Sequence, residues 1–135
     1  MKTLKILGTV TALMVSSLLV AGQYSPQPVT IDLDERTASG DMITARFSPN
    51  EHEYIGCGVR VYDNGVGGTE WYGFCQAVNE KKEKAFCNSS NKELLQAITA
   101  TADFSYIAFD WDKEGNCTRI GYSTQSFYIP KILGE

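Results

Sequence analysis

The stretch from Tyr54 to Val78 constrains the fold more strongly than any other part of the chain. Its sequence, YIGCGVRVYDNGVGGTEWYGFCQAV, predicts two β-strands joined by a glycine-rich turn, with one cysteine in each strand. If Cys57 lies opposite Cys75, the numbers of paired residues add up to 132, and one face carries only apolar or small side chains. These are Ile55, Cys57, Val59, Val61, Trp71, Gly73, Cys75 and Ala77. We expect this face to lie against the core.

The opposite face of the predicted hairpin gathers aromatic and polar side chains. Its candidate ligand-binding residues are Tyr54, Arg60, Tyr62, Tyr72, Phe74 and Gln76. In this register Phe74 covers the bare backbone of Gly58, and Arg60 lies against Tyr72. Aromatic rings among hydrogen-bonding groups are suited to binding a sugar or a peptide. The alternative is that a second layer, either a helix near 91–101 or a strand at 29–33, covers this face.

The N-terminus has the three-part pattern of a secretory signal peptide. Lys2 and Lys5 precede an uncharged, mostly apolar run from Ile6 to Val20, and small residues follow it. At about 15 residues, the run is shorter than the roughly 20 that a membrane-spanning helix needs. The sequence therefore predicts a cleaved signal peptide at 1–22 and one secreted or periplasmic domain at 23–135. An uncleaved N-terminal anchor is the alternative.

The four cysteines, at positions 57, 75, 87 and 117, indicate two disulfides in an exported chain. Four cysteines allow three pairings. The hairpin register favours Cys57–Cys75, which leaves Cys87–Cys117. A zinc site is the competing hypothesis, but the chain has no C-x2-C pair and a single histidine, His52.

The rest of the chain alternates between short strand patterns and turns. A capping box that begins at Ser90, followed by an apolar stripe, predicts one helix at about 91–101. Residues 35–41 predict a turn. The other predicted strands span 29–34, 42–47, 85–88, 104–111, 117–122 and 126–129. We therefore expect a mainly β, α+β domain: an antiparallel sheet or small sandwich of about six to seven short strands, with one helix and two disulfides.

The charge of the chain argues against nucleic acid as a partner. Lys and Arg number 12 against 16 Asp and Glu, and removal of the signal peptide lowers the net charge from −4 to about −6. Basic side chains cluster only at 80–84, so the chain has few groups to neutralise a phosphate backbone. No second long apolar segment follows the first, and we expect that the mature protein does not span a membrane.

The run DWDKEGN contains a partial calcium-binding pattern. Asp110, Asp112 and Glu114 place oxygen ligands at alternate positions before Gly115, as in the first half of a calcium loop. Gly121 occupies the position of the bidentate glutamate of an EF-hand, which argues against that motif. The alternative is a β-hairpin turn in which Gly115 adopts the left-handed conformation. No other cofactor is expected.

Three segments contain the cysteine framework and its neighbours. They are Tyr54-Ile55-Gly56-Cys57, Phe74-Cys75-Gln76-Ala77, and Phe109-Asp110-Trp111-Asp112 continuing through Gly115-Asn116-Cys117-Thr118. Together they resemble a group of small exported bacterial proteins with four cysteines and unknown function. The resemblance covers about 54–130, and only its cysteine framework is specific. It implies export and disulfides and carries over no functional residue.

These observations lead to three hypotheses for function. The first is a non-catalytic binding module for carbohydrate or protein that uses the aromatic and arginine face of the 54–78 hairpin. The second is an inhibitor or interaction protein that acts on another exported protein, such as an enzyme, through the loop at 63–69. The third is a small hydrolase built on acidic residues; its candidates are Glu53, Glu70, Asp110 and Asp112. The chain has none of the common catalytic motifs, which disfavours this third hypothesis.

Overall fold

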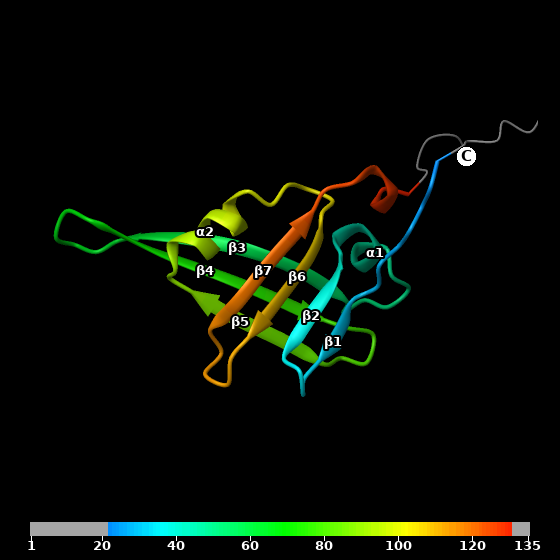
Figure 1. Ribbon diagram of the computed structural model, residues 1–135, viewed down its shortest axis with the longest axis horizontal. Helices are drawn as coiled ribbons and strands as arrows, with labels where there is room; N and C mark the ends of the chain where they lie inside the picture. Colours follow the sequence, from blue (N-terminus) through cyan, green and yellow to red (C-terminus); the bar gives the residue numbers. More distant parts are fainter. Residues whose placement is uncertain (1–21, 131–135) are drawn as a thin grey trace, which may run out of the picture.

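The structure is a computed structural model that describes residues 22–130, so the predicted signal peptide lies outside it except for Gly22. Its strands form two antiparallel sheets that pack on each other (Figure 1). The four-stranded sheet has the order β1-β2-β6-β7, with β1 at Thr30–Asp32, β2 at Thr37–Asp41, β6 at Tyr106–Trp111 and β7 at Cys117–Ser123. The three-stranded sheet has the order β3-β4-β5, with β3 at Tyr54–Asp63, β4 at Thr69–Val78 and β5 at Lys84–Ser89. The predicted fold class is therefore confirmed.

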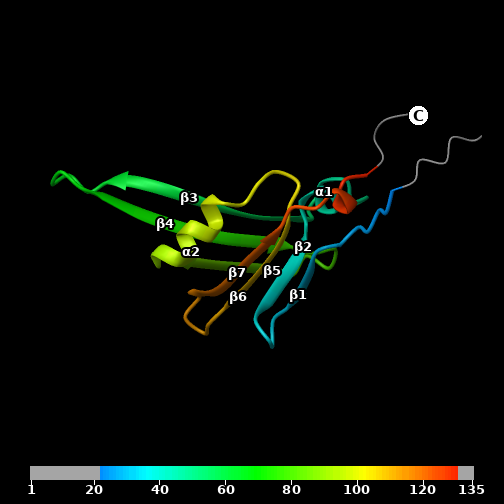
Figure 2. The same ribbon diagram turned by 45° about the horizontal axis from the view of Figure 1, so that its top comes forward.

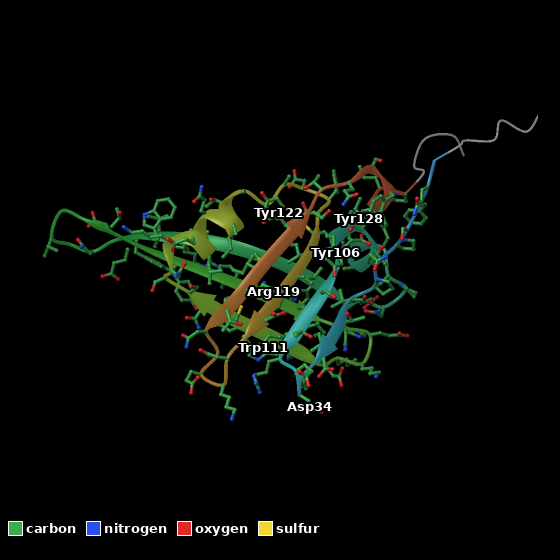
Figure 3. The ribbon with its side chains drawn as sticks, viewed as in Figure 1. Asp34, Tyr106, Trp111, Arg119, Tyr122 and Tyr128 are labelled. Carbon is green, nitrogen blue, oxygen red and sulfur yellow. A yellow bond between two sulfur atoms is a disulfide. The ribbon has the colours of Figure 1, made fainter. Side chains whose placement is uncertain are left out.

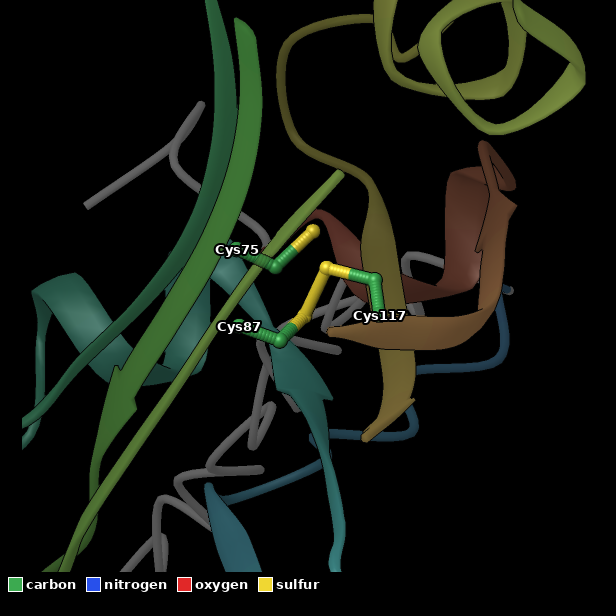
Figure 4. A group of neighbouring side chains, drawn as sticks. All are labelled: Cys75, Cys87 and Cys117. Carbon is green, nitrogen blue, oxygen red and sulfur yellow. A yellow bond between two sulfur atoms is a disulfide. The ribbon is translucent and has the colours of Figure 1, made fainter. Parts of the chain in front are cut away.

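The β3–β4 hairpin has the register predicted from its sequence. Cys57 pairs with Cys75, and every residue pair along the two strands adds up to 132. Both predicted disulfides are present: Cys57–Cys75 joins neighbouring strands, and Cys87–Cys117 joins β5 to β7. Figure 4 shows the second bridge crossing from one sheet to the other, with Cys75 beside it. The two sheets are thus covalently linked inside the core.

The core lies between the sheets. Phe109 and Ile107 of β6 are fully buried, and they belong to one cluster with Ile55 of β3, Ile98 of the longer helix and the bridging cysteines. Burial of an apolar side chain of this size contributes about 1.5–3 kcal/mol. Because alternate residues of each strand point into this cluster, the remaining side chains form the two outer faces of the sandwich.

Helix α2 (Lys92–Thr99) forms within the predicted range, although its cap lies one residue later than expected. The side chain of Asn91, rather than that of Ser90, accepts hydrogen bonds from the N–H groups of Glu93 and Leu94, at 3.0 and 3.1 Å. Within residues 22–130, no helix is long and apolar enough to cross a membrane.

The position of α2 depends on Gly73 of β4. A Cβ atom at Gly73 would lie 2.7 Å from Cδ1 of Ile98 and 2.8 Å from Cδ2 of Leu95. Both helical side chains are buried. The absence of a side chain at Gly73 therefore lets α2 rest directly on the inner face of the three-stranded sheet.

The segment predicted as a turn at 35–41 contains β2, an interior strand between β1 and β6. The glycine that suggested a turn has a different purpose. A Cβ atom at Gly40 would lie 2.9 Å from the Cα of Val29, so glycine permits the incoming chain to pass close to β2.

The predicted strand at 42–47 is also wrong, because helix α1 (Met42–Arg46) forms there. Its N-cap is Asp41, whose buried carboxylate accepts hydrogen bonds from the backbone N–H and the hydroxyl of Thr44, at 2.6 Å each. A local cap thus overrides the apolar pattern that suggested a strand.

The predicted last strand, at 126–129, is instead a 3-10 helix, η1 (Ser126–Tyr128). Tyr128 is buried and stacks on Tyr106 of β6, with ring centroids 5.7 Å apart. The burial of this ring ends the sheet at β7, because the chain must leave strand geometry to place the ring over β6.

The distal half of the hairpin projects past the rest of the molecule (Figures 1 and 2). We call residues 60–72 the arm. Val61 and Trp71, which the register places on the core face, are each 48% exposed. The prediction that they belong to the core is wrong, because in the described part of the chain no strand of the other sheet extends across the arm.

Candidate functional site

The outer face of the three-stranded sheet is exposed. The four-stranded sheet and α2 both pack on its inner side (Figure 2), so neither α2 nor β1 covers it as the alternative hypothesis required. Tyr54, Tyr62 and Phe86 on the outer side are 44%, 54% and 50% exposed. We call this surface the aromatic face; its residues are Tyr54, Arg60, Tyr62, Tyr72, Phe74, Gln76 and Phe86.

A row of three rings runs across the aromatic face from β4 to β5. The ring centroids of Tyr72 and Phe74 are 6.2 Å apart, and those of Phe74 and Phe86 are 6.5 Å apart, with interplanar angles of 29° and 20°. A Cβ atom at Gly58 would lie 2.9 Å from Phe74, so Phe74 covers Gly58 as the sequence predicts. The row is therefore held against the backbone of β3.

Arg60 lies over Phe74, with its guanidinium carbon 5.2 Å from the ring centroid. The prediction that it contacts Tyr72 is wrong, although Tyr72 is its direct cross-strand partner, because the long side chain reaches the diagonal neighbour. Among residues 22–130, the ion pair joins Arg119 to Asp110. Arg60 therefore has a cation–π contact but no ion pair there, and its guanidinium N–H donors are exposed.

Phe86 is a member of this face that the sequence analysis missed. It lies opposite Gln76, and its neighbours Ala85 and Cys87 are buried. Neighbouring residues of a strand point to opposite faces. Since a disulfide-bonded Cys87 is expected to face inward, this alternation could have placed Phe86 on the outer face.

The outer face of the four-stranded sheet has a different composition. We call it the polar face; its residues are Thr30, Asp32, Thr37, Ser39, Tyr106, Ala108, Asp110, Arg119, Gly121 and Ser123. Figure 3 labels Tyr106 and Arg119 on strands β6 and β7 of this sheet. Tyr106 is stacked on Tyr128, and the remaining side chains are small, polar or charged.

Two of the three carboxylates proposed for calcium, those of Asp110 and Asp112, are engaged within the β6–β7 hairpin. Asp110 accepts hydrogen bonds from Nε and Nη2 of Arg119, at 2.6 and 2.9 Å. Asp112 accepts from the side-chain amide and the backbone N–H of Asn116, at 2.8 Å each. Gly115 has φ of 84°, the left-handed turn conformation of the alternative hypothesis.

These contacts affect the ionisation of the hairpin. The side-chain and backbone hydrogen bonds from Asn116, with further N–H donors in the turn, hold the pKa of the Asp112 carboxyl below its usual value of 3.8. The hydrogen bond and charge of Asp110 raise the pKa of the Arg119 guanidinium.

The described residues do not bring Asp110, Asp112 and Glu114 together as a metal site. Across 22–130, the one group of three or more potential metal ligands within reach of a common ion is formed by the sulfurs of Cys75, Cys87 and Cys117 (Figure 4). All three sulfurs are in disulfides, which leaves them no thiolate to offer a metal.

Three of the four acidic residues of the hydrolase hypothesis also have structural partners, whereas Glu70 lies on the arm and lines a cleft. Glu53 accepts hydrogen bonds from the backbone N–H of Val29 at 2.9 Å and from the side-chain amide of Asn50 at 2.8 Å. Asp110 and Asp112 stabilise the β6–β7 hairpin. These three carboxylates therefore serve the fold.

Comparisons of the chain with family models, with curated proteins and with solved structures found no match. Conclusions about its function therefore rest on its own residues.

Proposed function

We propose that the protein is an exported, non-catalytic binding module that binds a protein partner through the aromatic face. The observation that carries the proposal is the half-exposure of Tyr54, Tyr62 and Phe86 on a face that the rest of the described chain leaves uncovered. Export is supported by the predicted signal peptide and by two disulfides, which are characteristic of oxidising compartments.

The chemistry of the face supports a protein partner more than a free sugar. Tyrosine, phenylalanine and arginine are enriched at the centres of protein interfaces. Phe74 is partly covered by Arg60, and Phe86 offers only apolar surface. The partner therefore needs exposed apolar side chains of its own to cover the rings.

The positive charge of Arg60 indicates which charged groups the partner should carry. The guanidinium of Arg60 is exposed and has no ion pair among the described residues. A carboxylate on the partner, placed beside its apolar patch, would satisfy it with charge-assisted hydrogen bonds. The proposed partner is thus an exported protein with an apolar patch bordered by Asp or Glu.

Site-specific photo-crosslinking tests this proposal. A photoreactive phenylalanine at position 86 should crosslink to a discrete partner in the exported protein fraction of the source cells, and the same group at Thr37 on the polar face should not. With the purified partner, Phe86→Ala and Arg60→Ala should each weaken binding by about tenfold or more, measured by calorimetry. Thr37→Ala and Ser39→Ala should leave binding unchanged.

Other outcomes would point elsewhere. The proposal would be contradicted if Thr37→Ala and Ser39→Ala weakened binding as much as Phe86→Ala and Arg60→Ala. Crosslinking of one copy to another would identify the face as a self-association surface. Loss of binding on Val66→Ser alone, at the exposed tip of the arm, would favour an inhibitor that acts through the loop.

A further inference from the structure

A cleft lies between the arm and α2, next to the distal end of the aromatic face, and Tyr62 and Tyr72 of that face also line it. It arises from the change in side-chain size along β4. At Gly73 the helix rests on the strand, whereas Trp71, two residues earlier and on the same face, is half exposed. Figures 1 and 2 show the arm continuing past α2.

The cleft has the size of a small-ligand site. Its volume is about 850 Å³, and it is lined by residues of the arm and of the segment at 90–99. Clefts that hold small ligands in proteins typically measure 300–1,000 Å³. The space can therefore accept a molecule of two or three sugar rings or of comparable size.

The lining of the cleft combines aromatic rings, those of Tyr62, Trp71 and Tyr72, with polar groups. The indole of Trp71 is half exposed, whereas Leu95 is buried and offers little surface. Gln96 is exposed on the helical wall and can both donate and accept hydrogen bonds. The cleft thus provides flat rings beside hydrogen-bonding groups.

The charges in the cleft balance. Glu70 of the arm and Lys92 of α2 both line it, and neither has an ion pair within 22–130. A single negative and a single positive charge select neither an anion nor a cation, and the net charge of −4 disfavours phosphate-bearing ligands. A neutral, hydroxyl-rich ligand with one apolar ring face matches this environment.

We propose that this cleft binds a neutral oligosaccharide, with one sugar ring stacked on Trp71 and its hydroxyls hydrogen-bonded to Glu70, Lys92 and Gln96. Trp71 and Gln96, which carry the test, do not belong to the aromatic face, so the test is independent of the proposed protein partner. Tyr62 and Tyr72 border both surfaces, and for that reason neither serves as a test variant.

Tryptophan fluorescence provides a direct test, because the chain has only two tryptophans. In the Trp111→Phe variant, Trp71 is the sole reporter. Titration with cellotriose, chitotriose, maltotriose and xylotriose, up to millimolar concentrations, should give a saturable change in fluorescence with at least one of them. Calorimetry with that trisaccharide should then show that Trp71→Ala weakens binding about tenfold or more, as loss of a stacking ring does elsewhere.

Matched variants separate this site from the rest of the surface. Gln96→Ala should weaken binding by about threefold to tenfold through loss of a hydrogen bond. Phe86→Ala, on the aromatic face, should leave it unchanged. Circular dichroism confirms that each variant is folded.

The proposal is overturned if none of the four trisaccharides binds, or if Trp71→Ala binds as tightly as the parent. Tighter binding of neutral triserine than of every trisaccharide would also overturn it. Loss of oligosaccharide binding on Phe86→Ala with no effect of Trp71→Ala would move the ligand to the aromatic face.

Discussion

The outer faces of the two sheets occupy equivalent positions on opposite sides of one core, yet their compositions differ. On the polar face, Thr30 and Ser39 share a hydrogen bond of 3.0 Å, and Asp110 pairs with Arg119. On the aromatic face, Tyr54, Tyr62 and Phe86 each leave about half of their surface in water. The same strand alternation produced both faces.

This difference separates what the fold requires from what it does not. An antiparallel sheet with one solvated face is satisfied by short polar side chains, as the polar face demonstrates. Exposed aromatic area contributes nothing to folding, because only burial removes it from water. The aromatic face is therefore the surface that folding alone does not explain, and variants that treat the two faces as matched partners can test the distinction.

The largest effect is expected from the disulfide that holds the two sheets, and with them the two faces, together. Replacement of Cys87 and Cys117 by alanine should lower the free energy of unfolding by about 3–4 kcal/mol, because it releases the longer of the two loops. The double alanine variant of Cys57 and Cys75, inside one sheet, should lose about 3 kcal/mol. Urea unfolding measures both losses.

A clearly smaller loss for the inter-sheet variant than for the intra-sheet variant would contradict this expectation. It would mean that the apolar core alone fixes the two sheets.

Gly58 of the three-stranded sheet and Gly121 of the four-stranded sheet should respond with opposite sign to replacement by alanine. At Gly58 an added methyl would meet Phe74 at 2.9 Å, whereas at Gly121 of the polar face the nearest atom is 3.9 Å away. Gly58→Ala should therefore destabilise by about 1 kcal/mol, since overpacking outweighs the entropic gain. Gly121→Ala should stabilise by about 0.5–1 kcal/mol.

Gly56, two residues before Gly58, is the control within β3, because nothing lies within 4 Å of an added methyl there. Gly56→Ala should therefore stabilise the protein, as Gly121→Ala does, and thermal unfolding measures both changes. If Gly58→Ala also stabilised the protein, Phe74 would not be held against β3.

Each face has one arginine with a defined contact, and the two contacts should differ in their response to salt. Arg119→Met removes an exposed ion pair and should cost less than about 1 kcal/mol, a loss that disappears in concentrated sodium chloride. Arg60→Met removes a cation–π contact and should cost about 0.5–1 kcal/mol with weaker salt dependence. Denaturant titrations at two salt concentrations distinguish them, and identical salt responses would argue against this assignment.

The smallest effect concerns pH and the turn that ends the polar face. Because the pKa of Asp112 is lowered on folding, its ionised form stabilises the folded state above about pH 4, and this contribution disappears as the pH falls through the lowered pKa. The difference in melting temperature between the wild type and Asp112→Asn should therefore be present at pH 7 and shrink below pH 4. A difference that is constant from pH 7 to strongly acidic conditions would contradict the assignment.

Several features of the site could be predicted from sequence because they depend on neighbours within one hairpin. The register around Cys57 and Cys75 follows from strand alternation, and so does the coverage of Gly58 by Phe74. The contact of Arg60 was assigned to the wrong ring, because a long side chain can choose between a direct and a diagonal neighbour. That choice depends on packing rather than on spacing.

Other features had no reliable local signal. The sequence predicts a turn and a strand over the segment at 37–46, whereas it forms an interior strand and a capped helix. Gly40 and Asp41 suggest a turn in isolation. Their actual contacts, with Val29 and with Thr44, depend on where the incoming chain passes.

By itself, the sequence determined the mainly β class and the hairpin register, and it favoured one of three disulfide pairings, because strand alternation acts between segments that pair directly. Only the tertiary structure decided which residues of the hairpin's apolar face are buried. Ile55 is buried in the core cluster, whereas Trp71, on the same face, is half exposed and borders a cleft. The physical reason is that burial depends on where the opposing layer ends. The residue pattern of one strand does not indicate how far the layer packed against it extends.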